Sequence, residues 1–117
     1  MKIVIAGSRT VRDENQVRSR IHQLLSELNI TPTEIVSGKA VGPDLIDETY
    51  ANMFKIPIKE MPANWNKYGK AAGHIRNKQM AEYADMAIVF WDGESAGSKN
   101  MISEMSKQKK LCIVEII

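Results

Sequence analysis

The regular alternation of short apolar runs with longer helical patterns constrains this chain more than any other feature. Residues 3–6 and 86–91 are almost continuously apolar, as strands buried on both faces of a parallel sheet are. Between and after them, apolar residues recur at intervals of three and four, which is the spacing of a helix. The pattern predicts an α/β fold: a doubly wound parallel sheet of about five strands with helices on both faces.

The same pattern assigns each segment. We expect strands at residues 3–6, 34–36, 56–61, 86–91 and 111–117. Pro57 predicts that the third of these lies at a sheet edge. The helices are expected after Asp13, after Asp44, from Gly73 and after Gly97. Their inward residues are predicted to be Val17, Ile21, Leu24, Leu25, Leu28, Leu45, Ile46, Tyr50, Met53, Ile75, Met80, Ala81, Ala84, Met101, Ile102 and Met105. Residues 62–72 are predicted to be an irregular loop, and Lys107, Lys109 and Lys110 to favour the C-terminal end of the last helix.

Bulk composition excludes several classes of protein. The chain has 117 residues, 44% of them hydrophobic and 26% charged, which predicts one ordinary domain over residues 1–117. A net charge of +2 is too small for a nucleic-acid coat. Cys112 is the single cysteine, and His22 and His74 have no metal-ligand spacing, so we expect no disulfide and no metal site. With no targeting or membrane-spanning run, we expect a cytoplasmic protein that does not bind membranes.

Small and polar residues collect where the predicted strands end. They occupy residues 7–10 after the first strand, 37–44 after the second and 92–100 after the fourth. In an open α/β sheet such loops meet in a crevice at the carboxyl ends of the strands. Glycine lets a ligand approach the backbone, and a helix N-terminus offers N–H groups to phosphate. The sequence therefore predicts a site for a phosphate-bearing ligand.

Individual residues in these loops allow more than one interpretation. Residues 38–42 lack the Gly-Lys-Ser/Thr ending of a P-loop, which disfavours nucleotide hydrolysis of the Walker type. Asp44 is either a helix cap or a ligand contact. Trp65 and Tyr68 either pack as a lid or stack on a base. Ser8 has no assigned base, so no Ser-His-Asp arrangement is expected.

Five motifs in order resemble a known family. They are Gly7-Ser8-Arg9, Ser37-Gly38-Lys39-Ala40-Val41-Gly42-Pro43-Asp44, Pro62-Ala63-Asn64-Trp65, Gly69-Lys70-Ala71-Ala72-Gly73-His74-Ile75-Arg76-Asn77 and Gly97-Ser98-Lys99-Asn100-Met101-Ile102. This series resembles the YspA/YpsA-related branch of the SLOG superfamily, whose wider membership includes the LOG phosphoribohydrolases and DprA. The chain departs from the family pattern at Val41, where a basic residue is typical.

The resemblance implies a Rossmann-like domain that binds nucleotides or nucleotide-derived molecules. Its ligand-binding residues would be Gly7, Ser8, Arg9, Gly38, Lys39, Gly42, Asp44, Trp65, Arg76, Asn77, Asp92, Gly97, Ser98 and Lys99. LOG hydrolases carry a glutamate at the position that matches Met101 here. Glu104, one helical turn further on, would be the catalytic residue only if the protein is an enzyme. The Pro-Gly-Gly-x-Gly-Thr run of those enzymes is also reduced, to residues 94–98.

These departures favour a binder over a hydrolase. The leading hypothesis is non-catalytic sensing or sequestering of a nucleotide-derived phosphate ligand, such as an ADP-ribose-type immune signal bound by a phage-encoded protein. No cofactor is expected, and the aromatic segment predicts a homo-oligomer. One alternative is a LOG-like nucleotide N-glycosidase. Another is a weak DprA-like module for single-stranded nucleic acid, which a +2 domain would bind poorly at physiological salt.

Overall fold

Five parallel strands form a single sheet in the computed structural model of the chain, which describes residues 1–7, 14–38 and 46–117. The strand order is β3-β2-β1-β4-β5, and every neighbouring pair is parallel. The strands are β1 (Lys2–Gly7), β2 (Glu34–Ser37), β3 (Ile58–Glu60), β4 (Met86–Trp91) and β5 (Leu111–Ile116). This order confirms the predicted doubly wound, Rossmann-like α/β fold.

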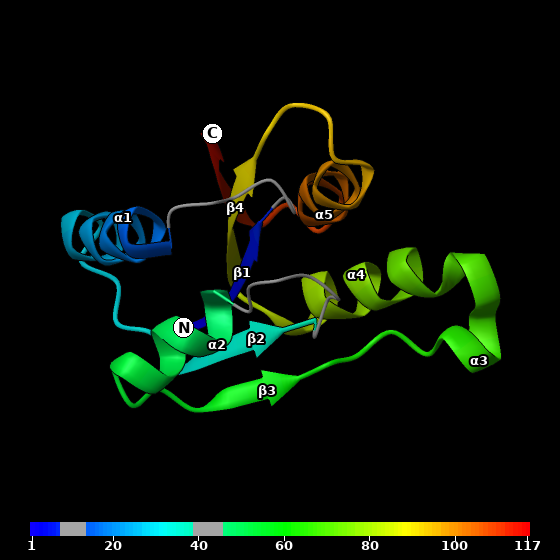
Figure 1. Cartoon of the computed structure of the whole chain (residues 1–117), viewed down its shortest axis with the longest axis horizontal. Coiled ribbons are helices and arrows are strands. Elements are labelled where there is room, and N and C mark those ends of the chain that lie inside the picture. The colour runs from blue at the N-terminus through cyan, green and yellow to red at the C-terminus, as the bar shows by residue number, and fades with distance from the viewer. Residues whose placement is uncertain (8–13, 39–45) are drawn as a thin grey trace.

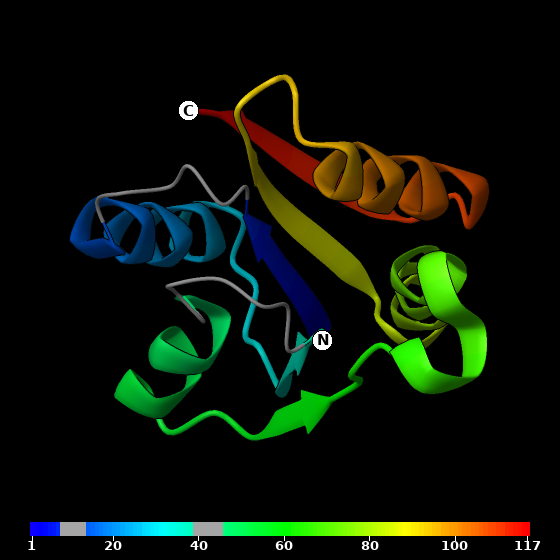
Figure 2. The ribbon, with the colours of Figure 1, turned by 45° about the vertical axis from the view of Figure 1, so that its right-hand side comes forward.

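Helices cover both faces of the sheet (Figure 1). Helices α1 (Glu14–Glu27) and α2 (Ile46–Met53) lie on one face, and α4 (Ala72–Tyr83) and α5 (Ala96–Lys107) lie on the other, as the turned view in Figure 2 also shows. Alternate residues of each strand serve the two layers: Ile3 and Ile5 pack toward α1 and α2, and Val4 packs toward α4 and α5. Two hydrophobic cores result, one on each side of the sheet.

The segment between β3 and α4 differs from the prediction. Residues 62–72 were expected to be irregular, yet they hold the short helix α3 (Trp65–Tyr68) and the 3₁₀ turn η1 (Gly69–Ala71). Asn64 caps α3, because its Oδ1 atom accepts a hydrogen bond of 3.0 Å from the backbone N–H of Lys67. A local cap therefore made a helical turn where composition alone indicated a loop.

The third strand is shorter than predicted but lies at the predicted edge. Only Ile58–Glu60 pair with β2, rather than all of residues 56–61. Pro57 has no N–H to donate, and it contributes only its carbonyl, which accepts a 2.9 Å hydrogen bond from the N–H of Ile35. The proline thus limits the start of the strand.

Two predicted inward residues are wrong, and one lysine has other partners than the helix end it was predicted to favour. Leu28 lies just beyond α1 and is 47% exposed, and Met53 ends α2 and is 63% exposed. Both residues continue the helical spacing of apolar positions, but they lie at helix ends whose side chains no longer face the sheet. Lys110 was expected to favour the end of α5. Instead it donates to the carbonyls of Ala81, Glu82 and Ala84, at 2.8, 2.8 and 2.7 Å, and so caps α4.

Of the remaining apolar positions, Leu45 lies outside the described residues, and most of those that the structure describes are buried. The α1 stripe and the α4 and α5 methionines are buried: Val17, Ile21, Leu24, Leu25, Met80, Met101 and Met105. Cys112 is half-buried, and burial raises the pKa of its thiol. In the described part of the chain, no helix is both long and apolar enough to cross a membrane. No cluster of three or more His, Cys, Asp or Glu residues suited to a metal ion occurs in the same ranges.

Candidate functional site

The carboxyl ends of β1, β2 and β4 meet at one edge of the sheet. Gly7, the last residue of β1, is in register with Phe90 of β4, and Gly38 directly follows β2. The chain leaves β1 toward β2 on one side and returns to β4 on the other, so the order of connections reverses between β1 and β4. Ligands of open α/β sheets bind at this kind of reversal. We call this edge the carboxyl edge.

Five of the predicted site residues cannot be placed at this edge. Ser8, Arg9, Lys39, Gly42 and Asp44 lie outside the described residues. The others are described: Gly7, Gly38, Trp65, Arg76, Asn77, Asp92, Gly97, Ser98 and Lys99.

Arg76 extends from α4 across to the end of β2. Its Nη1 atom donates a hydrogen bond of 2.6 Å to the Gly38 carbonyl, and its Nε atom donates one of 3.1 Å to Asn77 Oδ1. Gly38 permits this close approach, since a Cβ atom there would lie 3.0 Å from Arg76 Cδ. Burial lowers the pKa of the guanidinium, which nevertheless stays charged. Both of these partners are neutral, and no carboxylate within the described ranges forms an ion pair with Arg76.

Asn77 connects Arg76 to the start of α5. Its side chain is buried, with 5% exposed, and its Nδ2 atom donates to the Gly97 carbonyl at 3.2 Å and to Asn100 Oδ1 at 2.9 Å. Its Oδ1 atom accepts from Arg76. We call Gly38, Arg76, Asn77, Gly97 and Asn100, which these hydrogen bonds join, the Arg76 cluster. In it the Asn77 amide orients the guanidinium.

The loop after β4 is shaped by its own polar groups. Asp92 Oδ1 accepts hydrogen bonds from the backbone N–H groups of Glu94 and Ser95, at 2.9 and 2.8 Å. Ser95 caps α5, and its Oγ atom accepts from the N–H of Ser98 at 3.5 Å. Trp91 Nε1 donates to the Ser95 carbonyl at 3.1 Å. The Asp92 carboxylate therefore holds the turn that presents the N-terminus of α5.

The first turn of α5 adjoins the Arg76 cluster through Gly97. Ser98 is buried and Lys99 is exposed, and among the described residues no atom from outside the local backbone lies within 4 Å of the position that a Cβ on Gly97 would take. Backbone N–H groups in the first turn of a helix lack partners within the helix and favour anions.

Trp65 lies near the guanidinium but on a different element. Its side chain is 57% exposed and borders an open groove of about 400 Å³ lined by residues 62–66. A Cβ on Gly73 would lie 3.6 Å from Trp65 Cη2 and 3.9 Å from Arg76 Nη2. The indole edge and the guanidinium thus both reach the first turn of α4 at Gly73.

Comparison with known proteins identifies the family. The model of the YspA, cpYpsA-related SLOG family matches residues 1–68. The Gene 61 protein of Mycobacterium phage D29 is 31% identical over 114 residues, covering 91% of this chain and 89% of that protein. The chain belongs to the YspA, cpYpsA-related SLOG family. Among solved structures, S. aureus homoserine dehydrogenase aligns with a TM-score of 0.42 and 13% identity, over 98% of this chain. The chain spans 32% of that protein's length.

Two further positions bear on the chemistry of this SLOG domain. Met101, which stands where LOG enzymes carry glutamate, is 1% exposed and packs in the core between α4, α5 and the sheet. Glu104 is 8% exposed, and its Oε1 atom lies 3.2 Å from Lys107 Nζ, toward the C-terminal end of α5. At 1.5 Å of rise per residue, Glu104 lies about 10 Å along the helix from Gly97.

Two residues of this SLOG site were missed in the sequence. Asn100 joins the cluster through Asn77, 23 positions earlier, and nothing local predicts that pairing. Gly73 carried a usable signal, because a glycine in the first turn of a helix weakens the helix and calls for a packing or functional reason.

Proposed function

We propose that this SLOG domain binds a nucleotide-derived phosphate ligand of the ADP-ribose type and does not hydrolyse it. The observation that carries the proposal is Arg76, a half-buried guanidinium whose partners in the described structure are the Gly38 carbonyl and the Asn77 amide. Burying a cation without an opposite charge is unfavourable. A phosphate oxygen would supply that charge and could accept from the N–H groups of Arg76 that neither partner uses.

The surroundings of Arg76 suit a phosphate. Asn77 links the guanidinium to the Gly97 carbonyl, so the N-terminal turn of α5 and the cation belong to one hydrogen-bonded unit. Helix N-termini and guanidinium groups both favour phosphate, and the exposed Lys99 adds a second cation nearby in the chain. Direct ligand contacts from Gly7, Gly38, Gly97 and Lys99 form part of the proposal.

The proposal of binding without turnover rests on α5. Breaking an N-glycosidic bond needs a carboxylate that stabilises positive charge on the sugar or moves a proton. The Met101 side chain is a buried thioether, and Glu104 is paired with Lys107 about two turns away from Gly97. Neither side chain supplies a carboxylate at the carboxyl edge.

A free ligand could be sensed or sequestered by such a domain. Because Mycobacterium phage D29 encodes a similar protein, we favour sequestration of the ligand over sensing. A hydrolase and a module for single-stranded nucleic acid are the rival functions.

Two measurements test the proposal. Native mass spectrometry of freshly purified protein should detect a bound nucleotide-derived molecule, and calorimetry should give saturable binding of ADP-ribose, AMP or ribose 5-phosphate. Chromatography of the same mixtures should find no released base. Absence of binding to all three compounds would refute the proposal. Release of base at ordinary enzymatic rates that disappears in Glu104→Gln would make the protein a hydrolase instead.

A further inference from the structure

We infer that Trp65 forms the stacking wall for the base of the nucleotide whose phosphate binds Arg76. This inference rests on the proposed function and adds a second subsite to it. It names the residue that would contact the base of that ligand.

Trp65 is exposed although it is held in a defined place. It opens α3, a four-residue helix with no buried residue, and 57% of its side chain is accessible. An indole is among the largest apolar surfaces a protein can bury, and in this position that surface is left uncovered. Exposed aromatic groups at the edge of a groove are typical of binding sites.

Hydrogen bonds at both ends of α3 hold the backbone that carries Trp65. Asn64 caps the start of α3, and its carbonyl accepts hydrogen bonds from the N–H groups of Lys67 and Tyr68, at 3.2 and 3.0 Å. At the other end, the Gly69 N–H donates to the Trp65 carbonyl. Gly69 has a φ of +55°, which glycine adopts without strain. The indole is thus presented from a fixed turn, which limits the entropy lost on binding.

Trp65 and Arg76 reach the same place beside α4. Trp65 Cη2 and Arg76 Nη2 lie within 4 Å of the same point, the position of a Cβ on Gly73. In a nucleotide, the base and the phosphate are attached to the same sugar, so a ligand with its phosphate on the guanidinium brings its base close to the indole. Stacking on an aromatic side chain tolerates any base, since every base has a π-face.

Tyr68 provides a matched control on the same helix. It is also an exposed aromatic residue, at 37%, but its ring lies 5.1 Å from Lys67 Nζ and is not among the side chains within 4 Å of the Cβ position on Gly73. A general effect of removing an aromatic group from α3 would appear in both variants, whereas a stacking role would appear only at Trp65.

The experiment compares ligands with and without a base. Affinities of AMP, ADP-ribose and ribose 5-phosphate are measured by calorimetry for the wild type and for Trp65→Leu, Trp65→Phe, Tyr68→Leu and Arg76→Ala. We expect Trp65→Leu to weaken the binding of AMP and of ADP-ribose by about 5- to 150-fold, the usual size of one lost stacking contact. Ribose 5-phosphate should be unaffected, Trp65→Phe should restore most of the affinity, and Tyr68→Leu should bind like the wild type.

Three outcomes would overturn the inference. Equal weakening of AMP and ribose 5-phosphate in Trp65→Leu would assign Trp65 a structural role. Unchanged AMP affinity would remove it from the site. A change of mass in light scattering without a change in nucleotide affinity would make Trp65 a contact between copies of the chain. Failure of the proposed function would give different results. Either no ligand would bind the wild type, or Arg76→Ala would bind the ligands with the same affinity as the wild type.

Discussion

Charged side chains have different hydrogen-bond partners at the two edges of the sheet, where the strands begin and where they end. At the edge where the strands begin, the N–H of Lys2 donates to Asp85 at 2.7 Å, and the Tyr83 hydroxyl donates to Glu34. Lys110 caps α4 there with three hydrogen bonds. At the carboxyl edge, Arg76 donates only to neutral groups among the described residues. Charge at the first edge holds the fold together, whereas the proposed role of the Arg76 charge is to bind a ligand.

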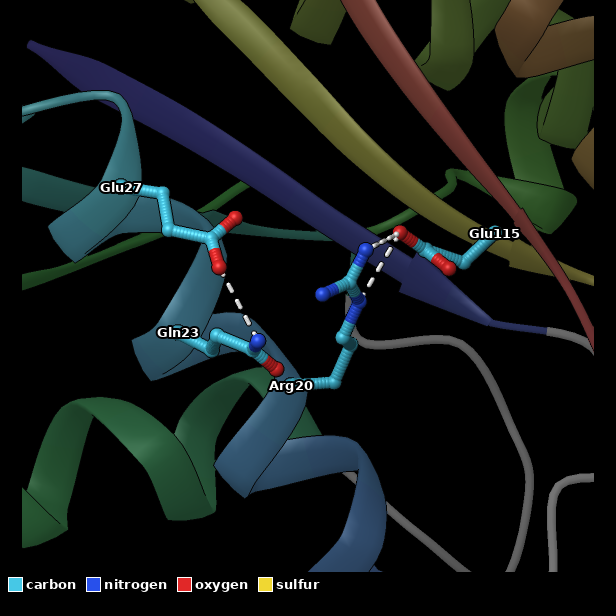
Figure 3. A network of polar contacts seen from close by, with 4 residues as sticks. All are labelled: Arg20, Gln23, Glu27 and Glu115. Carbon is cyan, nitrogen blue, oxygen red and sulfur yellow. Dashed lines mark hydrogen bonds and ion pairs between the residues drawn. The ribbon is translucent and has the colours of Figure 1, made fainter.

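Two arginines on opposite faces of the sheet, Arg20 and Arg76, differ in the same way in their hydrogen-bond partners. Arg20 of α1 donates from Nε and Nη2 to Glu115 Oε1 of β5, at 3.0 and 2.8 Å (Figure 3). The hydrogen bond to Glu115 raises the pKa of Arg20, whereas burial lowers that of Arg76. Gln23 and Glu27 continue the polar face of α1 with a 3.0 Å bond. One arginine has its counter-charge in the fold, and the other is predicted to receive it from a ligand.

The largest expected effect comes from removing one cation at each edge. Arg76→Ala should weaken ligand binding by about 1.5–3 kcal/mol, or roughly 10- to 150-fold, the usual size of a lost charged hydrogen bond. Its free energy of unfolding should change less than that, because Asn77 Oδ1 and the Gly38 carbonyl lose a donor but the cost of burying the guanidinium is also removed. Lys110→Met should lower the stability and leave ligand affinity unchanged. Three carbonyls at the end of α4 lose their donor, which should reduce the free energy of unfolding by roughly 1–3 kcal/mol. Calorimetry and urea unfolding measure both quantities.

Arg20→Ala is the matched control for Arg76→Ala. It removes the same side chain and is expected to lower stability slightly, the more so at low salt, because its ion pair with Glu115 is partly exposed. Ligand affinity should be that of the wild type. Equal affinity in Arg76→Ala and Arg20→Ala would show that the two arginines do not differ in function.

A smaller effect is expected from giving Arg76 a carboxylate of its own. Asn77→Asp would put an acidic group next to Arg76 Nε and would remove the donor to the Gly97 carbonyl and Asn100 Oδ1. We expect about tenfold weaker ligand binding, since one internal charge pair replaces part of the attraction for phosphate. Stability should fall by about 1–3 kcal/mol, because buried acceptors lose their partner.

Asn100→Asp is the control for that substitution. It keeps the oxygen that accepts from Asn77 Nδ2, so the Arg76 cluster stays connected. Its affinity loss should be smaller than that of Asn77→Asp. Wild-type affinity in Asn77→Asp would refute the idea that the neutral surroundings of Arg76 matter for binding.

The sequence predicted the fold more fully than the site, for a physical reason. Strands such as β4 are apolar along their whole length, and α1 shows its buried stripe at regular spacing, so local pattern is enough for both. The site depends on side chains that meet from distant segments. Asn77 with Asn100, and Lys110 with the end of α4, are pairings that no local pattern encodes.

Two local signals were also overlooked. The cap at Asn64 converts part of a polar segment into α3, and a cap is a single residue whose effect depends on the residues after it. Gly73, in the first turn of α4, belongs to the family motif, but its packing role was not predicted. Trp65 itself was among the predicted binding residues, but the capped turn that carries it was not predicted.

The smallest expected effect concerns Tyr83 at the edge where the strands begin. The hydrogen bond to Glu34 is the main cause that raises the pKa of Tyr83, with burial and the charge of Glu34 adding to it. The folded chain thus holds the phenolic proton more tightly than the unfolded chain does. This stabilisation is complete below the ordinary tyrosine pKa of about 10 and is lost as pH rises through the higher folded value. Tyr83→Phe lacks this stabilisation, so the variant should be slightly less stable than the wild type at pH 7, and the difference should shrink above about pH 10.

The other groups that titrate in this range are the same in both proteins. Lys2 and Lys59 face the ring at 4.2 and 5.8 Å, and burial raises the pKa values of Tyr50 and Cys112. Comparing the thermal unfolding of the two proteins from about pH 7 to 11 therefore isolates Tyr83. A difference in Tm that stays constant over this range would contradict the prediction, and a loss of ligand affinity in Tyr83→Phe would contradict the division of roles between the two edges.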